Sequence, residues 1–261
     1  MTLIRHELRQ ARRALAVWTA SIGLLIAVCV FMFPEMKKEM ESMNRLFASL
    51  GAFTAAFGMD KLNFGTLIGF YAVECGNILG IGGAFFAALA GINALAKEEG
   101  ERTAEFLLTH PVSRSWIVRQ KLAAAFLQVL ILNACVFALS AASIAAIGEA
   151  VPWRDLGLLH LAYLLLQLEL TCVCFGLSAF LRRGNPGLGI GLAAVMYFLN
   201  LLSNISESAR FLEFITPFAY AEGADILSNS ALDLKLIAIG TAFAAAGIIA
   251  AFARYMTKDI H

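Results

Sequence analysis

The sequence predicts an all-α, polytopic membrane protein with six transmembrane helices and an N-terminal amphipathic interfacial helix. Three observations support this prediction. Hydrophobic residues make up 60% of the 261 residues and charged residues only 15%, with a mean hydropathy of +0.76, whereas a soluble chain has about 25% charged residues. Six apolar stretches are each long enough to cross a hydrocarbon core of about 30 Å. Lys and Arg are also distributed unevenly between alternate loops.

Residues 1–14 are predicted to form a helix that lies in the inner headgroup layer. Apolar residues recur there at helical spacing, and four arginines occupy the remaining surface. The apolar positions are Leu3, Ile4, Leu8 and Ala11, and the arginines are Arg5, Arg9, Arg12 and Arg13. An apolar stripe beside a basic face is typical of interfacial helices. A plain cytoplasmic extension of the first span is the alternative.

The six apolar stretches are the predicted spans. In chain order they are 15–33, 66–96, 122–147, 156–181, 188–205 and 234–253. The first span runs into Pro34-Glu35 without a small-x-small cleavage site, so we expect it to be retained. In the second span, the glycines at 65, 69, 76 and 80 are expected to bend or interrupt the helix.

The distribution of basic residues predicts that both termini are cytoplasmic. Thirteen of the 20 Lys and Arg residues fall in 1–14, 97–121, 182–187 and 254–261, and seven fall in the alternate segments 34–65, 148–155 and 203–235. Cytoplasmic loops carry the excess of Lys and Arg in multi-pass proteins. We therefore expect one transmembrane domain over 1–261 in the cell membrane, with 34–65 external and no soluble domain large enough to be an enzyme.

Two external segments have more pattern than a plain loop. In 34–65, apolar residues alternate at steps of four and three, which predicts an amphipathic helix on the outer surface or over the bundle. Its methionines suit a flexible apolar ligand, but we favour packing against the second span. In 203–233, two short apolar pieces separated by Pro217 predict a shallow re-entrant or interfacial element.

The loop 97–121 reads KEEGERTAEFLLTHPVSRSWIVRQK and carries the most specific pattern. We predict a short helix over 98–109, a break at Pro111, and a new helix that begins at Ser113 or Ser115. Early acidic residues favour the first helix through its dipole. Phe106 and Leu107 give it an apolar patch. Such a helix, attached to two spans, is well placed to contact another protein.

This loop resembles the cytoplasmic signature of ABC-2 type transporter permeases, the membrane subunits of ATP-binding-cassette exporters. In that signature an acidic pair precedes Gly-Thr, a Glu, a leucine cluster and Pro-Val-Ser-Arg. The sequence matches it at Glu98, Glu99, Thr103, Glu105, Leu107, Leu108, Pro111, Val112, Ser113, Arg114 and Lys121. Arg102 stands where the family usually has glycine, which leaves the local helix geometry open. Six spans with an N-terminal amphipathic helix extend the resemblance over the whole chain.

The resemblance implies a transport function and defined partners. A dimer of permease subunits would contact a separate ABC ATPase through this loop and export a peptide, drug or other amphipathic substrate. The residues expected to carry ATPase coupling are Glu98, Glu99, Thr103, Glu105, Phe106, Leu107, Pro111 and Arg114. The sequence contains no G-x-x-x-x-G-K-[ST] phosphate loop. We therefore expect no enzyme activity and no bound cofactor in this chain, with ATP and Mg²⁺ held by the partner.

Three polar residues are predicted to lie at similar depth near the membrane midplane. They are Glu169, Asn133 and Asn200, in the fourth, third and fifth spans. Ionisable groups at this depth are costly and usually face the bundle interior or a wet cavity. A contact with substrate or a proton in a central pathway is one interpretation, and structural hydrogen bonding between helices is the other. Glu74, nearer the outer end of its span, is expected to be a solvated or capping group.

Other classes of function are less well supported by the sequence. The net charge of +1 gives no electrostatic footprint for nucleic acid. The histidines and cysteines lack the spacings of a metal site or a disulfide framework. An ion-driven carrier or channel that needs no ATPase is the alternative, but it would predict several charges along one pore line.

Overall fold

The computed structural model describes residues 2–38, 54, 62, 63, 65–100 and 112–258. Within these residues the secondary structure is helical. Six helices are long and apolar enough to cross a membrane: Leu3–Lys38, Leu67–Ile92, Arg114–Ala146, Trp153–Ser178, Pro186–Ile205 and Leu234–Thr257. The prediction of an all-α chain with six membrane-crossing helices is confirmed, although several helix ends differ from the predicted ones.

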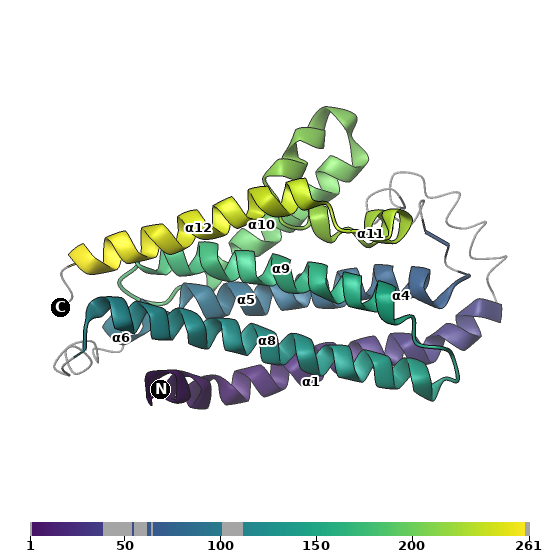
Figure 1. Ribbon diagram of the computed structural model, residues 1–261, viewed down its shortest axis with the longest axis horizontal. Helices are drawn as coiled ribbons and strands as arrows, with labels where there is room; N and C mark the ends of the chain where they lie inside the picture. The colour runs from purple at the N-terminus through teal and green to yellow at the C-terminus, as the bar shows by residue number, and fades with distance from the viewer. Residues whose placement is uncertain (1, 39–53, 55–61, 64, 101–111, 259–261) are drawn as a thin grey trace.

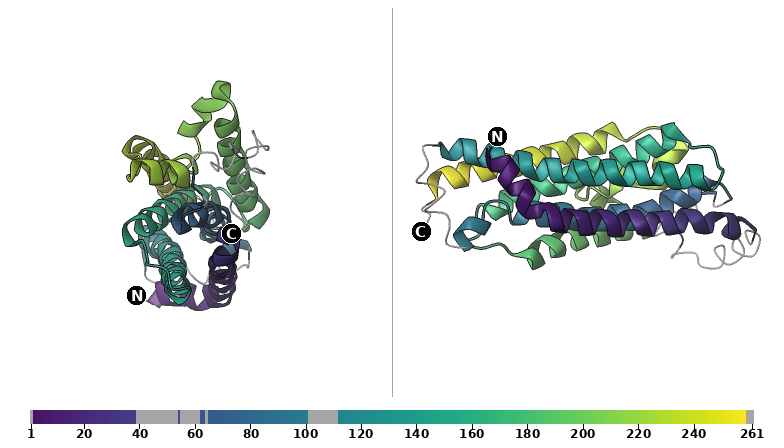
Figure 2. Two further views of the ribbon diagram at one scale, coloured as in Figure 1. Left: turned by 90° about the vertical axis from the view of Figure 1, so that its right-hand side faces the viewer. Right: turned by 90° about the horizontal axis from the view of Figure 1, so that it is seen from below.

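The first helix, α1 (Thr2–Lys38), combines the predicted interfacial helix and the first span. Residues 2–14 are helical, as expected, but they continue into the span without a break. The reason is local, because no glycine or proline interrupts the chain before Gly23. Figure 2 shows that the first turns are bent away from the rest of α1. Their position in the headgroup layer stays a prediction.

The second span is divided into three segments, as its glycines predicted. These are α4 (Leu67–Cys75), the π-helix η1 (Gly76–Ile81) and α5 (Gly82–Ile92). A side-chain carbon added at Gly76 would lie 3.1 Å from the hydroxyl of Tyr163. The glycine therefore lets a bulky ring from another helix pack against the π-helix. The span ends at residue 92, four residues before the predicted end, and a turn leads to the short helix α6 (Lys97–Gly100).

Three of the four remaining spans begin at polar capping residues, Ser113, Asn185 and Asp233, whereas the span Trp153–Ser178 follows Pro152. Their bounds are Arg114–Ala146 for α8, Trp153–Ser178 for α9, Pro186–Ile205 for α10 and Leu234–Thr257 for α12. Of the two serines considered, Ser113 is the cap of α8, and its hydroxyl accepts a hydrogen bond from the backbone N–H of Trp116 at 3.2 Å. Because of this cap, α8 begins eight residues before the apolar stretch at 122.

The segment between α10 and α12 is broken into short helices around Pro217, as predicted. These are η2 (Glu207–Phe214), η3 (Ala219–Ala221) and α11 (Gly223–Asn229). Phe218 and Tyr220 are buried. This segment, which we call the outer element, therefore places two aromatic side chains inside the helix bundle. The amphipathic stripe predicted in 34–65 lies almost entirely outside the described residues.

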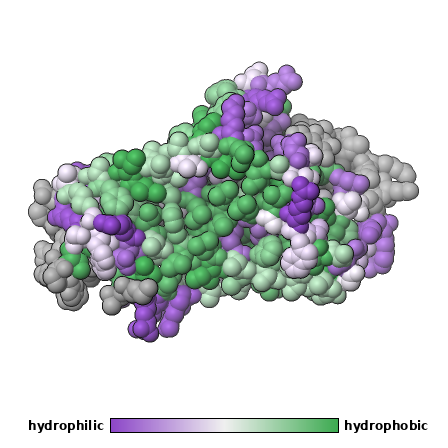
Figure 3. All heavy atoms as spheres, viewed as in Figure 1, coloured by the Kyte–Doolittle hydropathy of each residue, from purple (hydrophilic) through white to green (hydrophobic). Residues whose placement is uncertain are grey.

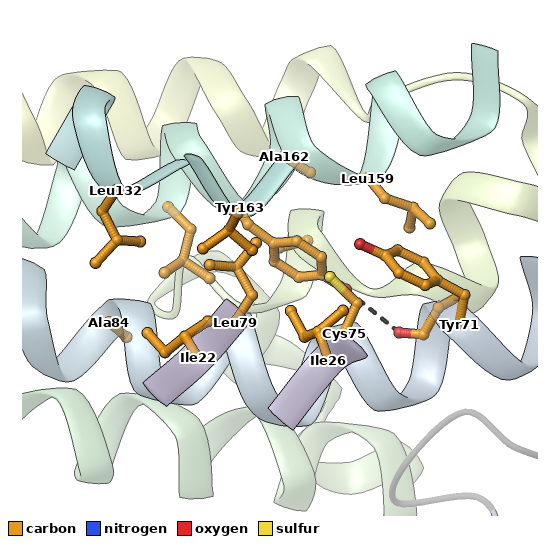
Figure 4. Close-up of a cluster of buried hydrophobic side chains, with 14 of the residues drawn as sticks. Ile22, Ile26, Tyr71, Cys75, Leu79, Ala84, Leu132, Leu159, Ala162 and Tyr163 are labelled. Atoms are coloured by element: carbon orange, nitrogen blue, oxygen red, sulfur yellow. Dashed lines mark hydrogen bonds between the residues drawn. The ribbon is translucent and has the colours of Figure 1, made fainter. Parts of the chain in front are cut away.

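The core is formed mainly by α1, the α4–η1–α5 span, α8 and α9. Figure 4 shows side chains from all four meeting around Tyr71 and Tyr163. By contrast, only Gly189, Ala193 and Asn200 of α10 are buried. Accordingly, α10 and α12 lie on the outside of the bundle (Figure 2).

The two ends of the bundle are chemically distinct from its middle. The start of α1, the helix α6 and the end of α12 lie at one end, and α4 and α11 begin near the other (Figure 1). On the face shown in Figure 3, hydrophobic residues cover most of the middle, and hydrophilic residues gather towards the ends and on the projection at the top. The bundle therefore has the surface of a membrane-crossing protein. That the end with α6 is cytoplasmic stays a prediction.

Candidate functional site

The predicted coupling loop is described only at its two ends. Glu98 and Glu99 lie on α6, and Arg114 is the first residue of α8. The other candidate coupling residues, Thr103, Glu105, Phe106, Leu107 and Pro111, lie outside the described residues. The ends of the loop show how it is attached to the bundle.

Charged residues from three helices and from the residue after α12 meet around α6. We call this group the α6 ion-pair cluster. It contains Glu7 of α1, Lys97, Glu98 and Glu99 of α6, Lys121 of α8, and Lys258, the residue after α12. Three carboxylates and three ammonium groups balance in charge. The cluster therefore joins the base of the loop to both ends of the chain and to the third span.

Lys121 lies at the centre of the cluster, with a side chain only 1% exposed. Its ammonium group lies 2.9 Å from a carboxylate oxygen of Glu7 and also pairs with Glu98. Lys97 lies 3.7 Å from the other Glu7 oxygen and donates a hydrogen bond to Gln10. A buried ammonium is tolerated only when carboxylates pair with it. Lys121 therefore requires α1 and α6 to stay together.

The C-terminal end of α12 is held at the same place. Lys258 lies 2.5 Å from a Glu99 carboxylate oxygen, and its ammonium donates to the backbone carbonyl of Leu181 at 2.5 Å. The Arg114 guanidinium donates to the carbonyl oxygens of Tyr255 at 3.3 Å and of Lys258 at 2.7 Å. Arg114 also places a cation at the C-terminal end of α12, where the helix dipole favours it. Both ends of the loop therefore contact the C-terminal end of α12 and Lys258, the residue that follows it.

The buried carboxyl group of Glu169 faces the outer element and α12. It accepts a hydrogen bond from the hydroxyl of Tyr220 at 2.8 Å. Gly240 of α12 lies directly against this carboxyl group, since a side-chain carbon at Gly240 would overlap it. Glu169 is about one helical turn from the middle of α9. The outer element thus reaches the middle of the bundle.

Asn133 and Asn200 have partners of their own. The Asn133 amide donates to the side-chain oxygen of Gln167 at 2.7 Å. The Asn200 amide donates to a carboxylate oxygen of Glu222 at 3.3 Å. The three midspan candidates therefore hydrogen-bond to three different residues, and no hydrogen bond within the described part of the chain joins one to another. The structure contains three polar contacts where the sequence suggested one cluster.

In a comparison with protein families, one family model matches nearly the whole chain. A family model described as ABC-2 family transporter protein matches residues 1–260. The chain belongs to the ABC-2 transporter family. Compared with curated proteins, the sequence gives no significant match.

As an ABC-2 family member, the chain is a multi-pass membrane subunit of a transporter. An ATPase partner is general to such permeases, which typically bind no cofactor themselves. The α6 ion-pair cluster thus belongs to a transporter subunit of a family that generally works with an ATPase.

Several residues that organise this ABC-2 subunit were missed at the sequence level. Tyr220, whose hydroxyl donates a hydrogen bond to Glu169, was not singled out from the sequence. Gln167 joins Asn133 and also donates to the carbonyl of Leu79 at 3.4 Å. Gln167 could have been noticed, because it is a polar residue in an apolar run, two positions before Glu169. Nothing in the sequence pairs Tyr220 with a residue 51 positions away.

Proposed function

We propose that this chain is the transmembrane permease subunit of an ATP-driven exporter. It works as a dimer with a separate ABC ATPase, and it moves a peptide, drug or other amphipathic substrate out of the cell. The ATPase binds the loop 97–121 on the cytoplasmic side, where both termini also lie. Closure of the ATPase pushes this loop and tilts the spans attached to it.

The α6 ion-pair cluster is the observation that carries this proposal. A loop that receives force must be attached to the elements that move. The base of this loop pairs with α1 through Glu7, with α8 through Lys121 and with the end of α12 through Lys258. A displacement of α6 would therefore act on three membrane-crossing helices together. If the loop were attached only to the two spans that it connects, its movement would not be transmitted to α1 and α12.

The proposed contact with the ATPase is tested at the centre of the loop. A few large buried side chains usually carry most of an interface's energy. Phe106→Ala should therefore weaken co-purification of the co-expressed ATPase by roughly 30-fold in affinity, the equivalent of about 2 kcal/mol. Glu105→Lys should act in the same direction by placing a like or unpaired charge in the contact. Substrate-stimulated ATP hydrolysis should fall with co-purification.

Phe211→Ala is the matched control, because Phe211 is a well-exposed aromatic residue of η2 at a distance from α6. This control should leave both measurements unchanged. Unchanged values in Phe106→Ala and Glu105→Lys would overturn the coupling role of the loop. Transport that continues without any ATPase would instead support the alternative, a secondary carrier or channel.

A further inference from the structure

A membrane-buried groove lies beside Glu169, between α8, α9 and α12. Its volume is about 260 Å³, just below the lower end, about 300 Å³, of typical small-molecule sites. Apolar side chains from the three helices form most of its wall, including Phe126, Leu165, Leu168, Ile237 and Ile248. Gly240, Ala244 and Ala245 keep the α12 side of the groove open because their side chains are small.

The wall has one acidic group, the carboxyl of Glu169. Within the described residues, its partner is the phenol of Tyr220, and no Lys, Arg or His forms an ion pair with it. A phenol is a neutral donor, so it hydrogen-bonds to the carboxylate without balancing its charge. A carboxylate at this depth is costly until a cation approaches it. The groove therefore combines an apolar body with an uncompensated acid.

The groove lies at the edge of the core, between α9 and the outer helix α12, so a ligand could enter it without separating the core helices. The α12 helix packs closely on α9, where a side-chain carbon at Gly176 would lie 2.6 Å from the backbone oxygen of Gly247. This close contact fixes the α9–α12 wall. Phe126 and Tyr220 add aromatic rings to the lining, and ring faces attract cations.

We propose that this groove binds a hydrophobic organic cation, with the apolar part of the ligand between α8 and α12 and its ammonium group at Glu169. This inference rests on the proposed export function in one respect: the bound cation is a transported substrate only if the chain is part of an exporter. Binding itself does not require the ATPase. A lipid acyl chain would fill the apolar part of the groove but would not use the acid.

The test compares two probes of similar shape, one cationic and one neutral. Naphthylmethylamine is a hydrophobic cation at neutral pH, and naphthylmethanol is its neutral counterpart of similar shape. Binding is followed by naphthyl fluorescence anisotropy with the permease in lipid nanodiscs, and empty nanodiscs correct for partition into lipid. The amine should bind the unmodified protein roughly 10- to 100-fold more tightly than the alcohol, the range expected for one charge-assisted contact.

Three variants locate the site. Glu169→Gln should remove the preference for the amine. Ala245→Leu should weaken the binding of both probes, because the larger side chain narrows the groove. Glu74→Gln is the matched control, since Glu74 is a span carboxyl that contacts Cys29 and does not line the groove.

Equal binding of amine and alcohol to the unmodified protein would overturn the proposal in favour of a lipid-filled groove, whether or not the variants fold. An unchanged preference in folded Glu169→Gln would overturn it as well. Loss of ATPase co-purification in Phe106→Ala is independent of these outcomes.

Discussion

Replacing Lys121 with methionine should destabilise the protein by removing the cation at the centre of the α6 ion-pair cluster. Methionine has a similar length and suits the buried position, so the change mainly removes charge. Glu7 and Glu98 would then lie close together without the ammonium that separates them. Removing one partner from a buried ion pair costs about 3–5 kcal/mol.

The structure places the expected loss at the lower end of that range. The side chains of Glu7 and Glu98 stay 13% and 15% exposed, so water can stabilise part of their charge after the substitution. We expect a loss of about 3 kcal/mol. For a chain of this size, that corresponds to a fall in melting temperature of roughly 6–12 °C, measured by tryptophan fluorescence in detergent.

Lys37→Met provides the control. The Lys37–Glu149 pair has the same chemistry, with 3.3 Å between nitrogen and oxygen, but its side chains are 53% and 41% exposed. Exposed pairs contribute about 0–1 kcal/mol, so a fall of at most roughly 4 °C is expected. Lys121→Arg keeps the charge and should fall between the two variants. If Lys121→Met melts within the range of the control, the cluster does not hold the helices together and the reasoning is wrong.

Further predictions concern topology, the midspan carboxyl and helix packing. In a cysteine-free background, a cysteine at Ser42 should react with an impermeant reagent in intact cells and one at Thr109 should not; the reverse pattern would invert the topology. Glu169→Lys should reduce membrane insertion more than Glu169→Gln, because a fixed cation at midspan costs about 2.5–3.5 kcal/mol on insertion scales; equal yields of inserted protein would contradict this. Gly176→Leu should abolish the folded peak in size-exclusion chromatography, since its side chain would overlap the backbone of α12. The control Gly157→Leu, where an added side-chain carbon meets nothing within 4 Å, should elute unchanged.

The spans could be predicted because hydropathy is a local property of the chain. An apolar run of about 20 residues must be helical in a membrane, whatever it packs against. The break at Pro217 and the interruption at Gly76 were predictable for the same reason, since proline and glycine act on their own backbone. Helix ends were less predictable, because α8 begins at the polar cap Ser113 and not at the start of its apolar run.

The candidate sites depended on contacts between residues far apart in the chain. The loop motif identified Glu98 and Lys121, which are 23 residues apart. Glu7 is 114 residues from Lys121, and no periodic pattern connects them. Similar depth suggested one cluster for the three midspan residues, but helix rotation determines which neighbour each side chain meets. Rotation follows from the packing of all six helices, so the sequence pattern did not determine it.

The π-helix at Gly76–Ile81 has a consequence for how this chain compares with its relatives. A π-turn holds more residues than an α-turn, so the second span contains about one residue more than a continuous α-helix of equal length would need. The helical periodicity of the apolar positions is therefore shifted between the residues before the π-helix and those after it. Relatives whose second span is a continuous α-helix are expected to be about one residue shorter there. An alignment that forces a single helical phase through the π-helix would pair the residues on one side of it with the wrong residues of another protein.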